Sequence, residues 1–256
     1  MPRAIYLAGD VHLGAVPPER EASFLRWLEH AGSAAERIIL NGDLFDFWFE
    51  YRSVIPRGHT RVLGALAALV DGGTPVVLMG GNHDCWGGSY LEEEVGLTLL
   101  HGPVVTELAG RRTLLAHGDG LGRGDLGYRA IKPILRAGLS RWAFRWLHPD
   151  LGARLARVVS KTGDHGTTEA HRLRSAALAE WGVAKLGAEP DLDLVILGHS
   201  HIPVLTEVGR DRWYVNAGDW VQHKSYLVLA EGEAPRLLAW EVSAEPTKAD
   251  GSRPRS

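Results

Sequence analysis

Residues 37–46, Arg-Ile-Ile-Leu-Asn-Gly-Asp-Leu-Phe-Asp, join a short apolar run to a polar turn that begins at Gly42-Asp43. A run of this length that ends in Gly and Asp is typical of a buried strand whose carboxyl end carries a site. The same arrangement of an apolar β-like run and a polar cluster occurs four more times, at Gly9–His12, Gly81–Asp84, His117–Asp119 and Gly198–His201. Five such clusters in order predict an α/β fold in which strand ends assemble one site.

The segments around this stretch alternate between strand and helix patterns. Strands are predicted at 4–8, 37–40 and 75–79, with helical patterns at 19–30 and 59–70 between them. This βαβαβ order favours a sheet with helices on its faces. Short strands are predicted again between 97 and 116, and strands after 194 are expected to finish the sheet system in antiparallel fashion.

The spacing of the clusters separates a core from an insertion. Asp10, Asp43, Asn82 and His117 follow one another at intervals of 33, 39 and 35 residues, and 82 residues then pass before His199. The extra length has a helical pattern and leaves and rejoins the core between two of the polar clusters. We therefore predict a core of residues 1–119 and 188–245, a helical cap insertion of 120–187 that lies over the site, and a flexible tail of 246–256.

The charge distribution points to an anionic substrate. The net charge is −3, but residues 121–185 hold twelve Lys or Arg against five acidic residues, so this segment is +7 and the remainder −10. A basic segment beside an acidic core suits an anion held partly by that segment. It could also rest on an anionic membrane surface. No nucleic-acid module or long basic stripe accompanies it, so no nucleic acid is expected, and no obligate protein partner is inferred.

The cysteine count, the start of the chain and the length of its apolar runs together predict the cellular compartment. The single cysteine, Cys85, excludes an intramolecular disulfide framework, and the chain starts directly with a core strand and no signal-peptide pattern. Its apolar runs are far shorter than the roughly 20 residues that span a bilayer. We expect a cytoplasmic protein, and the basic segment allows a peripheral place on the inner face of the cytoplasmic membrane.

The polar clusters contain seven candidate metal ligands: Asp10, His12, Asp43, Asn82, His117, His199 and His201. Asp10 and His12 are two residues apart, so at an extended strand end their side chains point to the same side. Seven donors are too many for one ion and suit two ions that share a bridging carboxylate and solvent. Oxygen and nitrogen donors without thiolate suit divalent Mn, Fe, Zn, Co or Mg, and a pair of such ions predicts hydrolysis of a phosphate ester or anhydride.

Each signal has a plainer interpretation. A single Gly-Asp or His-Gly is more often a turn than a ligand, and only the ordered set of five favours a metal site. His83 is either a packing imidazole or a catalytic one. Apolar and basic residues between 141 and 158 are either an acyl-chain chamber with a membrane-facing surface or ordinary helix packing with solvated arginines. The remaining histidines have no ligand-like spacing and are interpreted as surface or packing residues.

The motifs D-x-H, G-D-x-x-D, G-N-H-D, H-G-D and G-H-x-H, between Gly9 and His201, resemble those of the calcineurin-like metallophosphoesterase superfamily. The resemblance implies a four-layer β-sandwich flanked by helices, with a helical cap insertion. It implies one ion held by Asp10, His12, Asp43 and His201, and a second held by Asp43, Asn82, His117 and His199. It also implies that His83 contacts the phosphate and protonates the leaving oxygen, with Asp84 orienting its imidazole.

A narrower resemblance rests on residues 42–49 and 117–128. Together with the helical insertion they are similar to the UDP-2,3-diacylglucosamine diphosphatases of lipid A synthesis, which implies a Mn²⁺-type dinuclear hydrolase that yields UMP and 2,3-diacylglucosamine 1-phosphate. The substrate-binding residues would be Asn82, His83, Asp125 and Tyr128, with Arg123 and Lys161 as either phosphate contacts or surface charges.

One difference from this group keeps other functions open. His83 stands where the best-known members have Arg. A phosphodiesterase or nucleotide pyrophosphatase with a soluble substrate is therefore the alternative within the same class. From another class, an inactive metal-binding scaffold would hold a protein partner, although such a scaffold is expected to have lost ligands that this chain retains.

Overall fold

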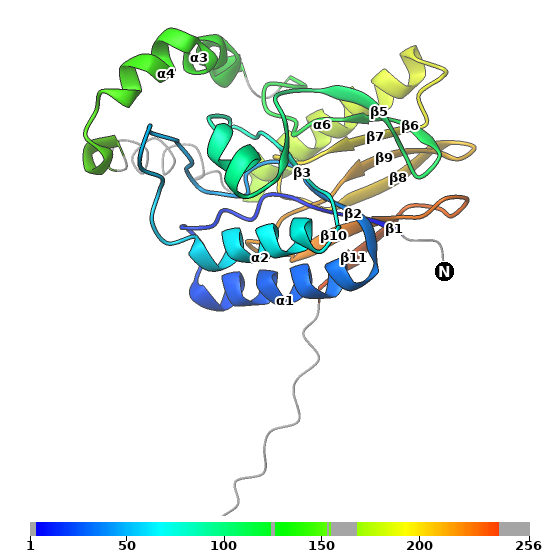
Figure 1. Ribbon diagram of the computed structural model, residues 1–256. Helices are drawn as coiled ribbons and strands as arrows, with labels where there is room; N and C mark the ends of the chain where they lie inside the picture. Colours follow the sequence, from blue (N-terminus) through cyan, green and yellow to red (C-terminus); the bar gives the residue numbers. More distant parts are fainter. Residues whose placement is uncertain (1–3, 124–125, 153, 155–167, 241–256) are drawn as a thin grey trace, which may run out of the picture.

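The computed structural model describes residues 4–123, 126–152, 154 and 168–240, which form two packed β-sheets with helices on their outer faces (Figure 1). The first sheet has the strand order β11-β10-β1-β2-β3-β4 and the second β5-β6-β7-β9-β8. The strands are β1 (Ala4–Ala8), β2 (Ala35–Leu40), β3 (Val76–Met79), β4 (Thr98–Leu100), β5 (Val104–Leu108), β6 (Arg111–Leu115), β7 (Leu194–Leu197), β8 (Val204–Gly209), β9 (Arg212–Asn216), β10 (Ser225–Leu229) and β11 (Arg236–Ala239). The helices are α1 (Pro18–Ala34), α2 (Thr60–Asp71), the short π-helix η1 (Tyr90–Glu94), α3 (Leu126–Arg136), α4 (Gly138–Arg145) and α6 (Thr168–Ala188).

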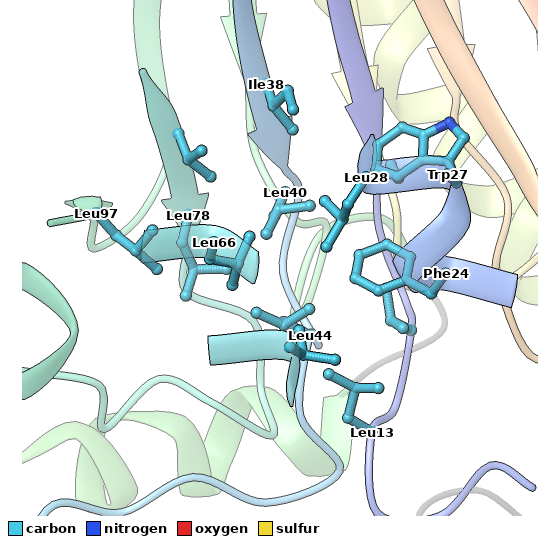
Figure 2. Close-up of a cluster of buried hydrophobic side chains, with 14 of the residues drawn as sticks. Leu13, Phe24, Trp27, Leu28, Ile38, Leu40, Leu44, Leu66, Leu78 and Leu97 are labelled. Atoms are coloured by element: carbon cyan, nitrogen blue, oxygen red, sulfur yellow. The ribbon is translucent and has the colours of Figure 1, made fainter. Parts of the chain in front are cut away.

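Alternating side chains create the layers. On β2, Ile38 and Leu40 pack against the helices α1 and α2 (Figure 2). Ile39, between them, belongs to the cluster between the two sheets. On β7, Leu194 and Ile196 belong to the same inter-sheet cluster. The alternate residues Val195 and Leu197 pack in the cluster that includes Leu178 and Leu186 of α6. The three buried clusters thus fill the spaces between four layers, which confirms the predicted two-sheet α/β fold with flanking helices.

Parallel pairing brings the polar loops to one edge. Strands β1, β2 and β3 are parallel, so the loops after Ala8, Leu40 and Met79 leave the first sheet at the same side. In the second sheet β6 and β7 are parallel, and the amide of Gly198 donates to the carbonyl of His117 at 2.7 Å. The antiparallel expectation for the later strands holds for β8 with β9 and for β10 with β11, but β7 is parallel to β9 as well as to β6.

The helices of the basic segment differ in what they pack against. Helix α6 covers the outer face of the second sheet through Leu178 and Leu186. Helices α3 and α4 project from the sheets at the edge where the polar loops emerge (Figure 1). We refer to residues 126–146, which include the C-cap Trp146, as the α3–α4 arm. Among the described helices, none combines the length and the apolar character needed to cross a bilayer. The division into a core and a 120–187 cap stays a prediction.

Candidate metal centre

The loops at this edge bring the predicted ligands together. One group consists of Asp10, His12 and His201, and another of Asp43, His117 and His199, with candidate donor atoms within 4.8 Å of one another in each group. A third group of His12, Asp43 and His83 joins these two. The seventh predicted ligand, Asn82, places its Oδ1 atom 3.3 Å from Nε2 of His117. All seven side chains therefore lie in one site.

Five of these seven residues have a left-handed backbone. The φ angles are 50° at Asp10, 51° at His12, 50° at Asp43, 66° at His199 and 62° at His201. Side chains other than glycine adopt this region rarely, and each instance costs about 1–3 kcal/mol. The extended backbone expected at Asp10 and His12 is thus wrong, although both side chains do belong to one donor group. Concentration of such residues at one place is typical of a functional site.

The glycines of the motifs leave room for ligand side chains. A Cβ atom at Gly81 would collide with the Asp43 carboxylate, and one at Gly42 would collide with the imidazole of His117. At Gly198 an added Cβ would lie 2.8 Å from Oδ2 of Asp10. In these three motifs the glycine is therefore required by the ligand of a different motif.

Asp43 occupies the centre of the site. Its Oδ2 atom lies 3.2 Å from Nε2 of His117, 3.8 Å from Nε2 of His12 and 4.0 Å from Nε2 of His83. Burial alone would raise the pKa of Asp43, but the facing imidazoles, His117 and His83 first, hold it well below its usual value. Burial would likewise lower the pKa of His117, and the Asp43 carboxylate raises it well above the ordinary histidine value.

At the end of the site that contains Asp10 and His201, the His201 ring is oriented by Asp219. The sequence analysis did not predict a role for Asp219. Nε2 of His201 lies 3.4 Å from Oδ1 of Asp10, and its Nδ1 atom lies 3.3 Å from Oδ2 of Asp219. Asp219 also accepts a 2.9 Å hydrogen bond from the ring of His223. Burial would raise the pKa of Asp219, whereas the hydrogen bond from His201 and the other contacts lower it. A carboxylate behind a ligand histidine fixes which ring nitrogen faces the metal.

We expect Asp219→Ala to weaken divalent metal binding by about 10–100-fold, because the His201 ring would lose the partner that orients it. Titration of the metal-free protein with Mn²⁺ by calorimetry measures this change. Asp211→Ala is the matched control, since that exposed carboxylate pairs with Arg111 at 2.7 Å and has no contact with the site. Equal Mn²⁺ affinity in wild type and Asp219→Ala would contradict the orienting role.

His83 is held in place by a backbone carbonyl. Its Nδ1 atom lies 2.8 Å from the carbonyl oxygen of Asp46. Because a carbonyl oxygen only accepts, this geometry assigns a proton to Nδ1 and makes Nε2 the nitrogen that faces Asp43. The backbone amide of His83 also donates to Oδ1 of Asp43 at 3.0 Å. The imidazole therefore stands beside the metal ligands with a defined tautomer.

Asp84 does not orient the His83 imidazole as predicted. Its carboxylate accepts amide hydrogen bonds from Leu44 at 2.7 Å, Gly81 at 2.8 Å and Asp43 at 3.3 Å. Burial, with the charge of Asp43, raises the pKa of Asp84 to about 6 against the lowering effect of these amides. Both carboxylate oxygens of Asp84 accept from backbone amides and so link the loops of Asp43 and Gly81, whereas the carbonyl of Asp46 accepts from the His83 ring.

The residues present fit divalent metal ions. Asp10 and Asp43 are buried, and within the described residues their side-chain ion pairs are with imidazoles alone. Oδ1 of Asp10 is buried without a hydrogen-bond partner. Buried carboxylates need compensating positive charge, which either protonated imidazoles or a metal supplies. A metal requires the neutral imidazoles, so metal and protons compete for the same donors.

The structure describes only some of the residues that were predicted to bind the substrate. Arg123 is exposed in the loop before α3. Asp125 and Lys161 lie outside the described residues, and so does the side chain of Tyr128 on α3. His171 on α6, interpreted from the sequence as a surface or packing residue, has its ring 5.8 Å from that of His201.

The α3–α4 arm is attached to two of the ligand loops. The carboxylate of Asp119 pairs with Lys132 at 2.7 Å and with Arg136 at 3.2 Å, and Arg136 also donates to the carbonyl of Gly81 at 3.4 Å. The indole of Trp86 donates to the carbonyl of Leu135 at 2.9 Å. Sequence reasoning had given Asp119 no such role, because its partners are distant in the chain.

The family model for calcineurin-like phosphoesterases matches residues 4–203. Two similar proteins are both named UDP-2,3-diacylglucosamine hydrolase. The protein from Porphyromonas gingivalis is 33% identical over 244 residues, which cover 88% of this chain and 93% of that protein. The protein from Pseudomonas putida is 32% identical over 245 residues, which cover 93% of this chain and 100% of that protein.

Among solved structures, similarity extends to Vps29 of Chaetomium thermophilum, with 13% identity, a TM-score of 0.42, and coverage of 88% of this chain and 79% of that one. The nuclease MPE of Pseudomonas putida has 15% identity, a TM-score of 0.40, and coverage of 92% and 84%. The family model spans more than half of the chain and includes every predicted metal ligand. The chain belongs to the calcineurin-like phosphoesterase family.

Proposed function

We propose that the protein hydrolyses the pyrophosphate bond of UDP-2,3-diacylglucosamine at a dinuclear metal centre, releasing UMP and 2,3-diacylglucosamine 1-phosphate. The observation that carries the chemistry is the pair of donor groups, Asp10-His12-His201 and Asp43-His117-His199, joined through Asp43. The substrate is suggested by the names of the relatives that match along most of the chain. Mn²⁺ is the proposed metal, and Fe, Zn, Co or Mg suit the same donors.

When bound, two divalent ions would polarise the phosphoryl oxygens and lower the pKa of a water between them. Asp43 would contact both ions, with Asp10, His12 and His201 on one side and Asn82, His117 and His199 on the other. As an imidazolium, with its Nδ1–H held by the carbonyl of Asp46, His83 would donate its Nε2 proton to the leaving oxygen and be left as the neutral Nδ1–H tautomer. Asp84 would hold the loops of Asp43 and Gly81 together, because its carboxylate accepts hydrogen bonds from the backbone amides of Leu44 and Gly81.

The sugar-phosphate part has a suitable space beside the arm. A cavity of 410 Å³ is lined by Gly80, Cys85, His101, Arg136 and Arg141, directly next to the segment that carries Asn82 and His83. Two guanidinium groups suit the phosphate of an acylated sugar phosphate. Burial raises the pKa of the Cys85 thiol to about 12, so the thiol stays protonated at neutral pH. Because only the thiolate is a good nucleophile, Cys85 would line the cavity without taking part in the chemistry.

The decisive assay is Mn²⁺-dependent release of UMP from UDP-2,3-diacylglucosamine in mixed micelles, with UDP-glucosamine lacking acyl chains as comparator. We expect release that depends on both Mn²⁺ and the acyl chains. Faster turnover of soluble diesters than of the lipid would favour the alternative, a phosphodiesterase or nucleotide pyrophosphatase. If none of the phosphate esters tested is hydrolysed, the result would favour the inactive metal-binding scaffold.

We also propose that the predicted cap rests on an anionic membrane through the outer surface of the α3–α4 arm. Several apolar side chains there are exposed, with exposed fractions of 62% for Ile134, 73% for Leu139, 58% for Trp142 and 76% for Trp146. Arg141 and Arg145 lie on the same helix. Exposed tryptophans beside arginines suit the interface of an anionic bilayer.

Replacement of both tryptophans tests this surface. We expect Trp142→Ser with Trp146→Ser to lower partitioning into phosphatidylglycerol vesicles by at least about tenfold, since each indole would lose its apolar contact with the lipid. Sedimentation with vesicles measures the change, and Val105→Ser, at an exposed apolar residue of β5, is the control. Equal partitioning of the double variant and the wild type would refute membrane contact through the arm.

A further inference from the structure

A second cavity, with a volume of 400 Å³, lies away from the arm at the amino ends of α1 and α2. Its lining includes Pro18, Glu21, Ala22 and Leu25 of α1 and, from the loop before α2, Arg57 and His59. The α1 residues among them have the spacing i, i+3, i+4 and i+7, so one face of the first two turns of α1 forms a wall. The volume lies within the range of pockets for small organic ligands.

The cavity is close to the metal centre. Gly14 follows the predicted ligand His12 by two residues, so at most about 7 Å of chain separates them. The amides of Ala15 and Val16 both bond to the carbonyl of His12, which folds this loop back on itself. The ring of His59 lies 4.9 Å from that of Phe45, whose loop carries Asp43. Since Gly14 also lines the cavity, the cavity adjoins the two loops that carry His12 and Asp43.

The charged groups of the cavity have no ion-pair partner in the part of the chain that the structure describes. Among the described residues, Glu21, Arg57 and Arg61 make no ion pair. His59 is 6% exposed, and its Nδ1 atom is buried with no hydrogen-bond partner. The remaining wall, formed by Val16, Pro18, Ala22 and Leu25, is apolar. A flat apolar ligand with a few hydrogen-bonding groups at its edge matches this lining.

We propose that this cavity binds the pyrimidine nucleoside half of the substrate, an inference that rests on the proposed function. A uracil ring offers two carbonyl acceptors and one N–H donor at its edge. Arg57 and Arg61 supply donors for the carbonyls, Glu21 supplies an acceptor for the N–H or the ribose hydroxyls, and the apolar residues of α1 cover a ring face. The cavity beside the arm then takes the sugar phosphate, and the metal centre lies between the two halves.

A direct binding experiment isolates the base. Titrations of the Mn²⁺-loaded protein with UMP and with ribose 5-phosphate share the metal-bound phosphate and differ in the uracil. We expect wild type to prefer UMP, and Arg57→Ala combined with Arg61→Ala to reduce this preference about tenfold or more, since hydrogen bonds from charged donors are lost. Arg26→Ala removes an exposed arginine of α1 that does not line the cavity and is the control.

Kinetics provide the second readout. The double arginine variant and Glu21→Gln should raise the KM for UDP-2,3-diacylglucosamine about tenfold and leave kcat/KM for bis(p-nitrophenyl) phosphate, which has no nucleoside, within about twofold. An unchanged UMP preference, or equal losses on both substrates, would overturn the assignment of the cavity. Failure of wild type to cleave the lipid would refute the proposed substrate, and the UMP titration would still decide whether the cavity binds a nucleoside.

Discussion

Asp43→Ala is expected to abolish turnover and to remove bound metal at the same time. The carboxylate stands within 3.2–4.0 Å of the imidazoles of His117, His12 and His83. It belongs to the group with His117 and His199, and also to the group with His12 and His83 that joins this group to Asp10, His12 and His201. Loss of the shared ligand should therefore weaken both ions. Metal ions supply several kcal/mol of transition-state stabilisation, so the rate should fall by about 10³–10⁴-fold. Turnover, together with elemental analysis of metal content, measures the effect.

A second variant distinguishes the loss of metal binding from a loss of folding. Asp43→Asn keeps the shape of the side chain and removes its charge, so it should fold and yet bind less metal than wild type. Asp71→Ala, at the exposed end of α2, controls for the loss of a carboxylate elsewhere. Normal metal stoichiometry in both Asp43 variants would contradict the bridging role.

His83→Ala is expected to retain metal and to lose about 10²–10⁴-fold in turnover, the range that general acid–base catalysis supplies. The physical reason is the fixed orientation of the ring, whose Nδ1 is bonded to the carbonyl of Asp46 and whose Nε2 faces the centre. Steady-state kinetics and metal analysis on the same preparation separate this outcome from that of the Asp43 variants. His148→Ala, at an exposed histidine of the basic segment, is the control. A rate equal to wild type would remove His83 from the mechanism.

Much of the fold could be predicted because its signals are local. The alternation at Ile38, Ile39 and Leu40 reflects two different neighbouring layers, and a continuous apolar run such as Leu194–Leu197 indicates a strand covered on both faces. The direction of β7 was not predictable in the same way. A strand that is apolar on both faces has no residue that distinguishes parallel from antiparallel neighbours, and the choice follows from the path of the preceding helix α6.

The ligands of the site were predictable from side chains, whereas the contacts that orient them were not. His83 is held by the carbonyl of Asp46 and His117 by the carbonyl of Asn41 at 2.9 Å. Every residue has a carbonyl group, so such partners leave no signal in a sequence. The role of Asp84 was misread for a related reason, because its partners are backbone amides. Asp219 belongs to none of the five polar clusters, so no signal in the sequence pointed to its contact with His201.

The left-handed backbone at five of the seven ligands has a consequence for evolution of the chain. Five such residues together cost roughly 5 kcal/mol or more, which is comparable with the net folding stability of a whole domain, about 5–15 kcal/mol. Glycine at Asp10 or His199 would relieve part of that cost and would also remove a ligand. Selection for stability alone therefore drives this chain away from catalysis, and only continued demand for the reaction keeps the costly residues in place.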